Sequence, residues 1–121
     1  MEKENTDLLI EKIVKGMQEK KARDIVVADL TRVEDAICKA FVICTGGSPA
    51  QVAAIADSVG ETARKEAGSK PTAVSGLRNS VWVAMDYSDV MVHIFLPDER
   101  DFYDLEFLWA DARLISLENQ D

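Results

Sequence analysis

The first twenty residues place apolar side chains at the spacing of an α-helix. Between Asn5 and Lys21 they recur every three or four positions, with Asp7 near the beginning and Lys20 near the end, where each suits the helix dipole. The apolar stripe consists of Leu9, Ile10, Ile13, Val14 and Met17. We therefore expect an amphipathic helix that packs one side on a core.

Two short apolar runs follow, at residues 25–28 and 41–44, and both are rich in β-branched side chains. Neither run alternates with polar residues, as a strand with one wet face would. The runs therefore predict two strands covered on both faces, in the middle of a sheet.

Residues 48–67 carry the clearest helix signals in the chain. Ser48 is a good N-cap, Pro49 suits the first helical position, and Gln51 can complete a capping box. Apolar residues at helical spacing continue until Gly68, which is the residue type favoured just past a helix end. A helix over 48–67 is expected, followed by a short strand over 72–74.

The runs 81–86 and 89–95 are separated only by Tyr87 and Ser88, which predicts a tight antiparallel hairpin. A two-residue loop would pair Asp86 with Asp89, Met85 with Val90, Ala84 with Met91, Val83 with Val92, and Trp82 with His93. One face would then be wholly apolar, with Val81, Val83, Met85, Val90, Val92 and Ile94. The opposite face would carry Trp82, Ala84, Asp86, Asp89, Met91 and His93.

A third helix is expected after Pro97, with Asp98 as its cap. Its inward stripe would be Phe102, Leu105, Leu108, Trp109 and Ala112, and a second apolar line would be Tyr103, Phe107 and Ala110. Such a helix either lies deep in the fold or offers one side to a partner. Residues 113–117 form a short apolar tail, and we expect 118–121 to fray.

The predicted order of helices and strands gives an α/β fold, in which a mixed sheet has helices packed against it. A chain of 121 residues, 47% of them hydrophobic, suffices for one core. We expect a single domain over residues 1–121. No apolar run reaches membrane-spanning length and the first residues are highly charged, so a soluble cytoplasmic protein is predicted.

Charge and cysteine content narrow the classes of partner. Fourteen basic and 22 acidic residues give a net charge of −8, which repels a phosphate backbone and disfavours direct nucleic-acid recognition. A basic protein surface would be a better partner. Cys38 and Cys44 are the only cysteines and form no CxxC motif, so we expect no disulfide framework, and Cys44 reads as a core residue.

The turn Thr45-Gly46-Gly47-Ser48 joins a predicted strand to a predicted helix, where backbone amides can hold an anion. A turn of this kind is similar to the Gly-Ser element of nucleotidyltransferases. However, a strand-to-helix turn needs glycines and a cap for structural reasons alone, and no lysine follows to make a P-loop. We favour the structural interpretation.

Three further side chains invite a chemical interpretation. Asp86 and Asp89, if opposed across the turn, could bind Mg²⁺. In nucleotidyltransferases, however, the two metal-binding carboxylates lie two residues apart on one strand. Solvated aspartates in turns are also commoner than metal-binding ones. His93 is the only histidine, which excludes sites built from several imidazoles. It is expected to pack against Trp82 and can form one hydrogen bond. Trp82 is either an interface anchor or a core residue. No catalytic residue, metal site or cofactor is predicted.

Read together, an ordered set of residues resembles the signature of the Iojap, or ribosomal silencing factor, family. The set is Gly76, Trp82, Asp86, Asp89, Val90, Val92, His93, Phe95, Arg100, Phe102, Tyr103, Leu105, Glu106, Leu108 and Trp109. The segment 41–48, followed by Val52, Ile55, Ala56 and Asp57, resembles the family's other common block. The likeness covers nearly the whole chain from Leu8.

The resemblance implies a nucleotidyltransferase-like fold without transferase activity, often dimeric. It also implies binding to a ribosomal protein of the large subunit, on the face where the small subunit joins, so that joining is blocked and translation falls. Family contact residues carry over to Trp82, Asp86, Asp89, His93, Arg100, Tyr103 and Glu106. Ser88 departs from the family, which usually has glycine there. The alternative is a nucleotide-binding or nucleotidyltransferase-type enzyme that uses Thr45 to Ser48 with Asp86 and Asp89.

Overall fold

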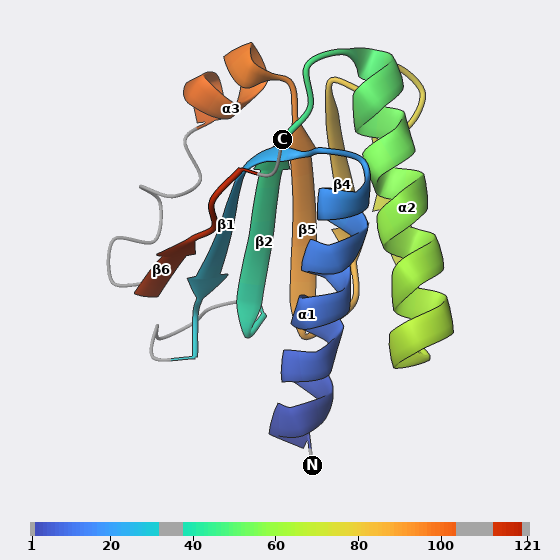
Figure 1. The fold of residues 1–121 in the computed structure, drawn as a ribbon, viewed down its shortest axis with the longest axis vertical. Helices are drawn as coiled ribbons and strands as arrows, with labels where there is room; N and C mark the ends of the chain where they lie inside the picture. Colours follow the sequence, from blue (N-terminus) through green and yellow to red (C-terminus); the bar gives the residue numbers. More distant parts are fainter. Residues whose placement is uncertain (1, 32–37, 104–112, 120–121) are drawn as a thin grey trace.

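The protein, described by a computed structural model over residues 2–31, 38–103 and 113–119, is built on one mixed sheet (Figure 1). Across the sheet the strands are β3 (Ala73–Ser75), β4 (Trp82–Asp86), β5 (Val90–Phe95), β2 (Ala40–Thr45), β1 (Arg23–Asp29) and β6 (Arg113–Ser116). Among the described strands, β2 and β5 alone pair in parallel. The predicted α/β fold with a mixed sheet is confirmed, and β1 and β2 lie inside the sheet as expected.

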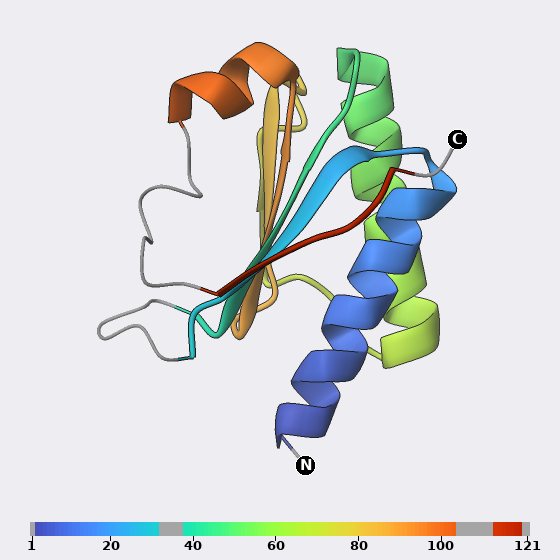
Figure 2. The same cartoon turned by 60° about the vertical axis from the view of Figure 1, so that its left-hand side comes forward.

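Helices lie on both sides of this sheet, but not equally. Figure 2 shows α1 (Glu2–Glu19) and α2 (Pro49–Ala67) side by side on one face, with α3 (Pro97–Tyr103) on the other. Helix α1 begins three residues before its predicted start and ends two residues before its predicted end, because Lys21 turns the chain with φ of +60°. In α3 the structure describes only the first turns of the third predicted helix, whose later residues lie outside the description.

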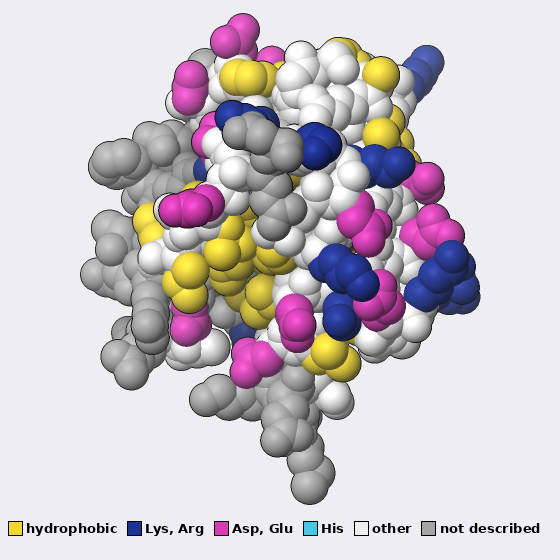
Figure 3. All heavy atoms as spheres, in the orientation of Figure 1, with side chains coloured by type: hydrophobic (Ala, Val, Ile, Leu, Met, Phe, Trp, Pro, Cys, Tyr) yellow, Lys and Arg dark blue, Asp and Glu magenta, His cyan; other side chains and the backbone are white. Residues whose placement is uncertain are grey.

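The main core lies between the sheet and the two long helices. The predicted apolar side of the hairpin faces it, because Val83, Val92 and Ile94 are fully buried there. The stripe of α1 contributes Leu9, Ile13 and Met17, as expected. Cys44 is buried among them as a free thiol, and burial raises its pKa far above the ordinary range. Outside this core, acidic and basic side chains are interspersed over the helical face (Figure 3).

The ends of α2 form as the sequence predicts. The Ser48 hydroxyl accepts a hydrogen bond from the Gln51 amide at 3.1 Å, Pro49 opens the helix, and Gly68 closes it with φ of +64°. Gln51 departs from the predicted capping box, because its side chain bonds to the Gly47 amide in place of the Ser48 amide. Its side-chain carbonyl oxygen accepts from the Gly47 amide at 2.7 Å, and its NH₂ group donates to the carbonyls of Lys20 and Lys21. Gln51 therefore ties the start of α2 to the end of α1.

Helices α1 and α2 approach closely at Gly16. A Cβ atom at Gly16 would lie 2.8 Å from the Cα of Val59, and the Ser58 hydroxyl donates to the Gly16 carbonyl at 2.8 Å. Backbone atoms cannot move aside as a flexible side chain can. The close approach therefore requires glycine at position 16.

Gly60, on α2, gives a matched comparison. A Cβ atom there would meet only the Met85 methyl group, at an ordinary 3.6 Å. We expect Gly60→Ala to raise the free energy of unfolding by roughly 0.5–1 kcal/mol, because alanine is the better helix former. Gly16→Ala should instead lower it by about 1 kcal/mol, since overpacking outweighs the same gain. Urea unfolding of both variants measures these changes in the free energy of unfolding. If both variants gained or both lost stability, the packing described would be contradicted.

The C-terminal segment was predicted only as an apolar tail. The structure shows a strand, β6, which pairs antiparallel with β1 and places Ile115 opposite Val27. Beyond it, the Leu117 amide donates to the Ile25 carbonyl, and the Asn119 side chain accepts from the Asp24 amide at 2.7 Å. Of the residues expected to fray, 120 and 121 lie outside the described part.

Candidate functional site

The hairpin β4–β5 holds most of the predicted site residues, and its register differs from the prediction. The observed pairs set Trp82 opposite Phe95, Ala84 opposite His93 and Asp86 opposite Met91. The Tyr87 amide donates to the Val90 carbonyl at 2.9 Å, so Tyr87 belongs to the paired part of the hairpin. The loop is therefore Ser88 and Asp89 instead of Tyr87 and Ser88. Each strand residue therefore meets a partner two places later than expected. A two-residue shift leaves every strand side chain on its predicted face.

On the side of the sheet away from α1 and α2, four rings gather into what we call the aromatic face: Phe41, Trp82, His93 and Phe95. Trp82 stacks on Phe95 with centroids 5.0 Å apart and planes at 26°. Phe41, from β2, meets the His93 ring edge-on at 5.0 Å. Sequence reasoning missed Phe41 as a member, because only the parallel pairing of β2 with β5 brings Phe41 beside the hairpin.

Trp82 is half-buried, so part of its ring remains accessible. Its indole N–H donates to the Nδ1 atom of His93 at 3.1 Å. The expected contact with one hydrogen bond is therefore present, although the two residues are diagonal neighbours rather than an opposed pair. The hydrogen bond and the stacking fix the orientation of the Trp82 ring, which makes it a rigid aromatic side chain at a partly exposed position.

His93 is 6% exposed, much less than a contact residue would normally be. Burial lowers its pKa from 6.5 to about 4, so the ring is neutral near pH 7. Because Nδ1 accepts from Trp82, the remaining proton resides on Nε2. Among the described residues Nε2 has no hydrogen-bond partner. His93 is therefore the buried member of the aromatic face, and it holds the Trp82 ring through their hydrogen bond.

The two aspartates do not form the opposed pair that was considered as a magnesium site. Asp86 faces Met91, and its carboxylate accepts the Ser88 amide at 2.7 Å. Asp89 lies in the turn, where its carboxylate meets the Thr6 hydroxyl of α1 at 3.4 Å and the Lys39 ammonium at 3.7 Å. Asp89 therefore does not share a strand face with Trp82, because the shifted loop removes it from the strand. No group of three or more metal-binding side chains occurs in the part described.

Arg100 on α3 is engaged inside the protein. Its guanidinium donates to the Asp24 carbonyl at 2.6 Å and to the Thr45 hydroxyl at 2.9 Å. These contacts fasten α3 across the ends of β1 and β2, so Arg100 positions the helix that carries Tyr103. The Tyr103 side chain and all of Glu106 lie outside the described residues. Their predicted contact roles stay predictions.

The turn from Thr45 to Ser48 uses its glycine amides within the fold. The Gly46 amide donates to the Phe95 carbonyl at 2.9 Å, and the Gly47 amide donates to Gln51. A Cβ atom at Gly46 would lie 2.9 Å from the Val52 side chain. This geometry supports the structural interpretation of the turn, because neither glycine amide is left to face an anion.

Comparisons with known proteins agree on one family. The model for "Ribosomal silencing factor during starvation" matches residues 3–121. The chain belongs to the ribosomal silencing factor family. It is 37% identical over 110 residues to "Ribosomal silencing factor RsfS" of Halalkalibacterium halodurans, covering 91% of this chain and 92% of that one. The protein of that name from Bacillus subtilis is 39% identical over 100 residues, 83% of each chain.

Solved structures agree with the family assignment. A crystal structure of a protein from Chromobacterium violaceum superposes with a TM-score of 0.78 at 33% identity, over 84% of this chain and 83% of that one. The family resemblance noted in the sequence is thereby confirmed. None of the described helices has the length and apolar character needed to span a membrane.

Ser88 lies in the hairpin turn, in a backbone conformation that favours glycine. Ser88 adopts φ of +70°, in the left-handed region that glycine enters without steric cost. We expect Ser88→Gly to raise the free energy of unfolding by roughly 0.5–1 kcal/mol, because the strain exceeds the entropy cost of glycine. Chemical denaturation would measure the change. A loss of stability would mean that the strain is relieved by contacts of the serine side chain.

Proposed function

We propose that the protein represses translation by binding a ribosomal protein of the large subunit at its subunit-joining face, so that the small subunit cannot join. The observation that carries this proposal is the family match over residues 3–121. Two relatives whose names describe ribosomal silencing factors align over most of their length, which supports the same activity here.

The surface chemistry of the chain supports a protein partner on the ribosome. A net charge of −8 favours contact with a basic protein and disfavours contact with ribosomal RNA. Trp82 is a rigid, partly exposed aromatic anchor, the kind of residue that contributes much of the energy of an interface. We propose that the aromatic face, with Asp86 beside it, contacts the partner. Asp89, Arg100, Tyr103 and Glu106 complete the proposed contact set.

We further propose that the protein acts in the cytoplasm, as a binding protein and without catalysis. The amides of Gly46 and Gly47 serve the fold, and the aspartates are not opposed, which supports this view. Pairing of two copies, implied by the family resemblance, stays a prediction that sedimentation equilibrium would test.

Sedimentation with purified subunits tests the proposed function. The protein should co-sediment with large subunits and not with small ones, and at saturation it should slow the formation of joined ribosomes. Equal binding to both subunits would contradict the proposal, as would unaltered joining at saturation. Binding to isolated large-subunit proteins would then identify the partner.

A further inference from the structure

A groove lies between α2 and the outer strand β3, on the helical side of the sheet and therefore away from the aromatic face. Its volume is about 750 Å³. Small residues of α2 form one wall, and the segment around β3 forms the other, with Met85 of β4 also lining it. Its lining includes Gly60, Asp57, Arg64, Val74, Leu77 and Met85.

The β3 wall presents two features that a partner can use. β3 is the outermost strand of the sheet, so one side of its backbone lacks a strand partner among the described residues. Val74 and Leu77 are 39% and 51% exposed, and they are two of only five large apolar side chains this exposed in the part described. An edge strand beside an apolar groove is the arrangement that binds an extended peptide as an added strand.

The α2 wall is hollowed by a glycine that the fold does not need. Gly16 is required by a helix crossing and Gly76 by a φ of +90° close to the Trp82 carbonyl. Gly60 has neither reason, since a Cβ atom there would make only one ordinary contact, with Met85. A glycine inside a helix costs roughly 0.5–1 kcal/mol. Its presence keeps open the part of the groove above Met85, which indicates that the space itself is used.

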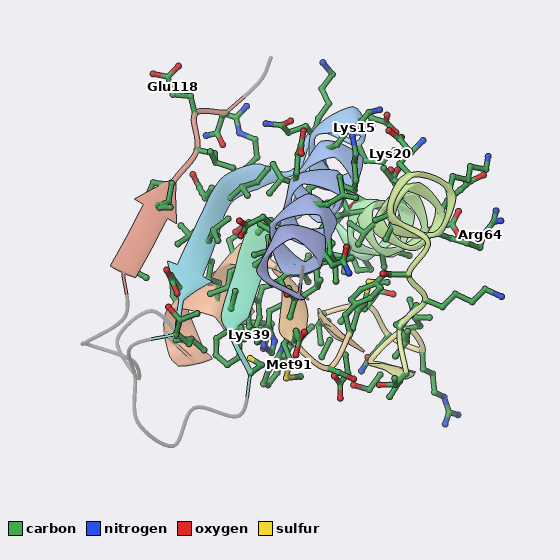
Figure 4. All side chains as sticks on the ribbon, turned by 90° about the horizontal axis from the view of Figure 1, so that it is seen from below. Lys15, Lys20, Lys39, Arg64, Met91 and Glu118 are labelled. Atoms are coloured by element: carbon green, nitrogen blue, oxygen red, sulfur yellow. The ribbon has the colours of Figure 1, made fainter. Side chains whose placement is uncertain are left out.

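The rim of the groove on α2 carries Asp57, Glu61 and Arg64 at successive turns. Glu61 forms an ion pair with Lys65 at 2.7 Å, so its negative charge is largely compensated. In the described part of the chain, the Asp57 side chain makes no ion pair or hydrogen bond, which leaves one unpaired carboxylate among the lining residues of the groove. Arg64 lines the far end of the groove, two turns of α2 beyond Asp57, and its side chain extends outward from α2 (Figure 4). The rim therefore favours a basic side chain beside an apolar one.

We propose that the groove binds an extended segment of a partner protein, which pairs with the free edge of β3. An aliphatic side chain of this segment packs against Val74 and Leu77, and a basic side chain extends across the groove, over Gly60, to Asp57. This second docking surface lies across the sheet from the aromatic face and does not depend on the proposed function. A second copy of the chain is a poorer occupant, because two molecules of net charge −8 repel each other.

The test uses a capped heptapeptide, Val-Thr-Lys-Thr-Val-Thr-Lys, in which valine and lysine both face the groove when the peptide is extended. It is added to the full-length protein in about 0.15 M salt to screen non-specific attraction. Backbone amide resonances of residues 73–75 and methyl resonances of Val74 and Leu77 should shift and saturate. Gly60→Leu fills the groove and should weaken binding at least about tenfold. Ala50→Leu adds the same side chain to α2 outside the groove and should leave binding unchanged. Thermal melting checks that both variants fold.

If Gly60→Leu does not fold, Val74→Lys gives the same test from the other wall, since Val74 is exposed and a lysine there repels the peptide. Binding that survives both substitutions would overturn the proposal. So would saturable shifts on β6 instead of β3. The same heptapeptide with glutamate in place of both lysines should bind at least about tenfold more weakly, and equal binding would refute the role of Asp57.

Discussion

Trp82→Ala should weaken binding to the large ribosomal subunit at least about tenfold, and about thirtyfold if Trp82 is a principal anchor. The indole is partly exposed, stacked on Phe95 and hydrogen-bonded to His93, so it is presented to a partner with little freedom left to lose. Truncation removes the contact area and the fixed orientation together. Titration of labelled protein into purified subunits measures the change.

Loss of stability must be separated from loss of contact in this experiment, because Trp82→Ala also removes packing from Phe95. Val83→Ala is the matched control, since Val83 is the next residue along β4, is fully buried and faces the opposite core. It should cost about 2 kcal/mol of stability and leave the affinity of folded molecules unchanged. If Trp82→Ala binds with wild-type affinity, the aromatic face is not part of the interface. A loss that merely follows the unfolded fraction would do the same.

The second expected result concerns acid. Folded His93 has a pKa of about 4, whereas the unfolded chain protonates its histidine near the ordinary 6.5. As pH falls below 6.5, His93 takes up a proton in the unfolded state but stays neutral in the folded state. The contribution of His93 to the free energy of unfolding is therefore fully present above pH 6.5 and declines toward pH 4. For these values the loss between about pH 7.5 and pH 5 is on the order of 2 kcal/mol.

His93→Gln isolates this contribution, because glutamine can still accept from the Trp82 indole but does not titrate. Urea unfolding at about pH 7.5 and pH 5 should show a drop in the wild type that exceeds the drop in the variant by about 2 kcal/mol. Carboxylates titrate in both proteins and cancel in the difference. An equal drop would mean that His93 is solvated in the folded state.

Local physical chemistry in the sequence determined the ends of α2. Ser48 and Pro49 act on the first turn of α2, and Gly68 acts on its last turn, so each effect can be read without knowing the fold. The same is true of the two faces of the hairpin, since side chains alternate along any strand. Those faces were correct even where the register was not, because the difference was two residues.

The tertiary structure alone decided the register, the strand β6 and the contents of the aromatic face. Two-residue loops at 87–88 and at 88–89 are both compatible with the local sequence. The second is held by Asp89, which accepts hydrogen bonds from Thr6 of α1 and from the backbone amides of Lys39 and Ala40. β6 is only four residues long and gains its hydrogen bonds from β1, nearly ninety positions earlier in the chain. His93 is buried because β2 brings Phe41 across it. Such pairings join distant segments, and no periodicity within either segment encodes them.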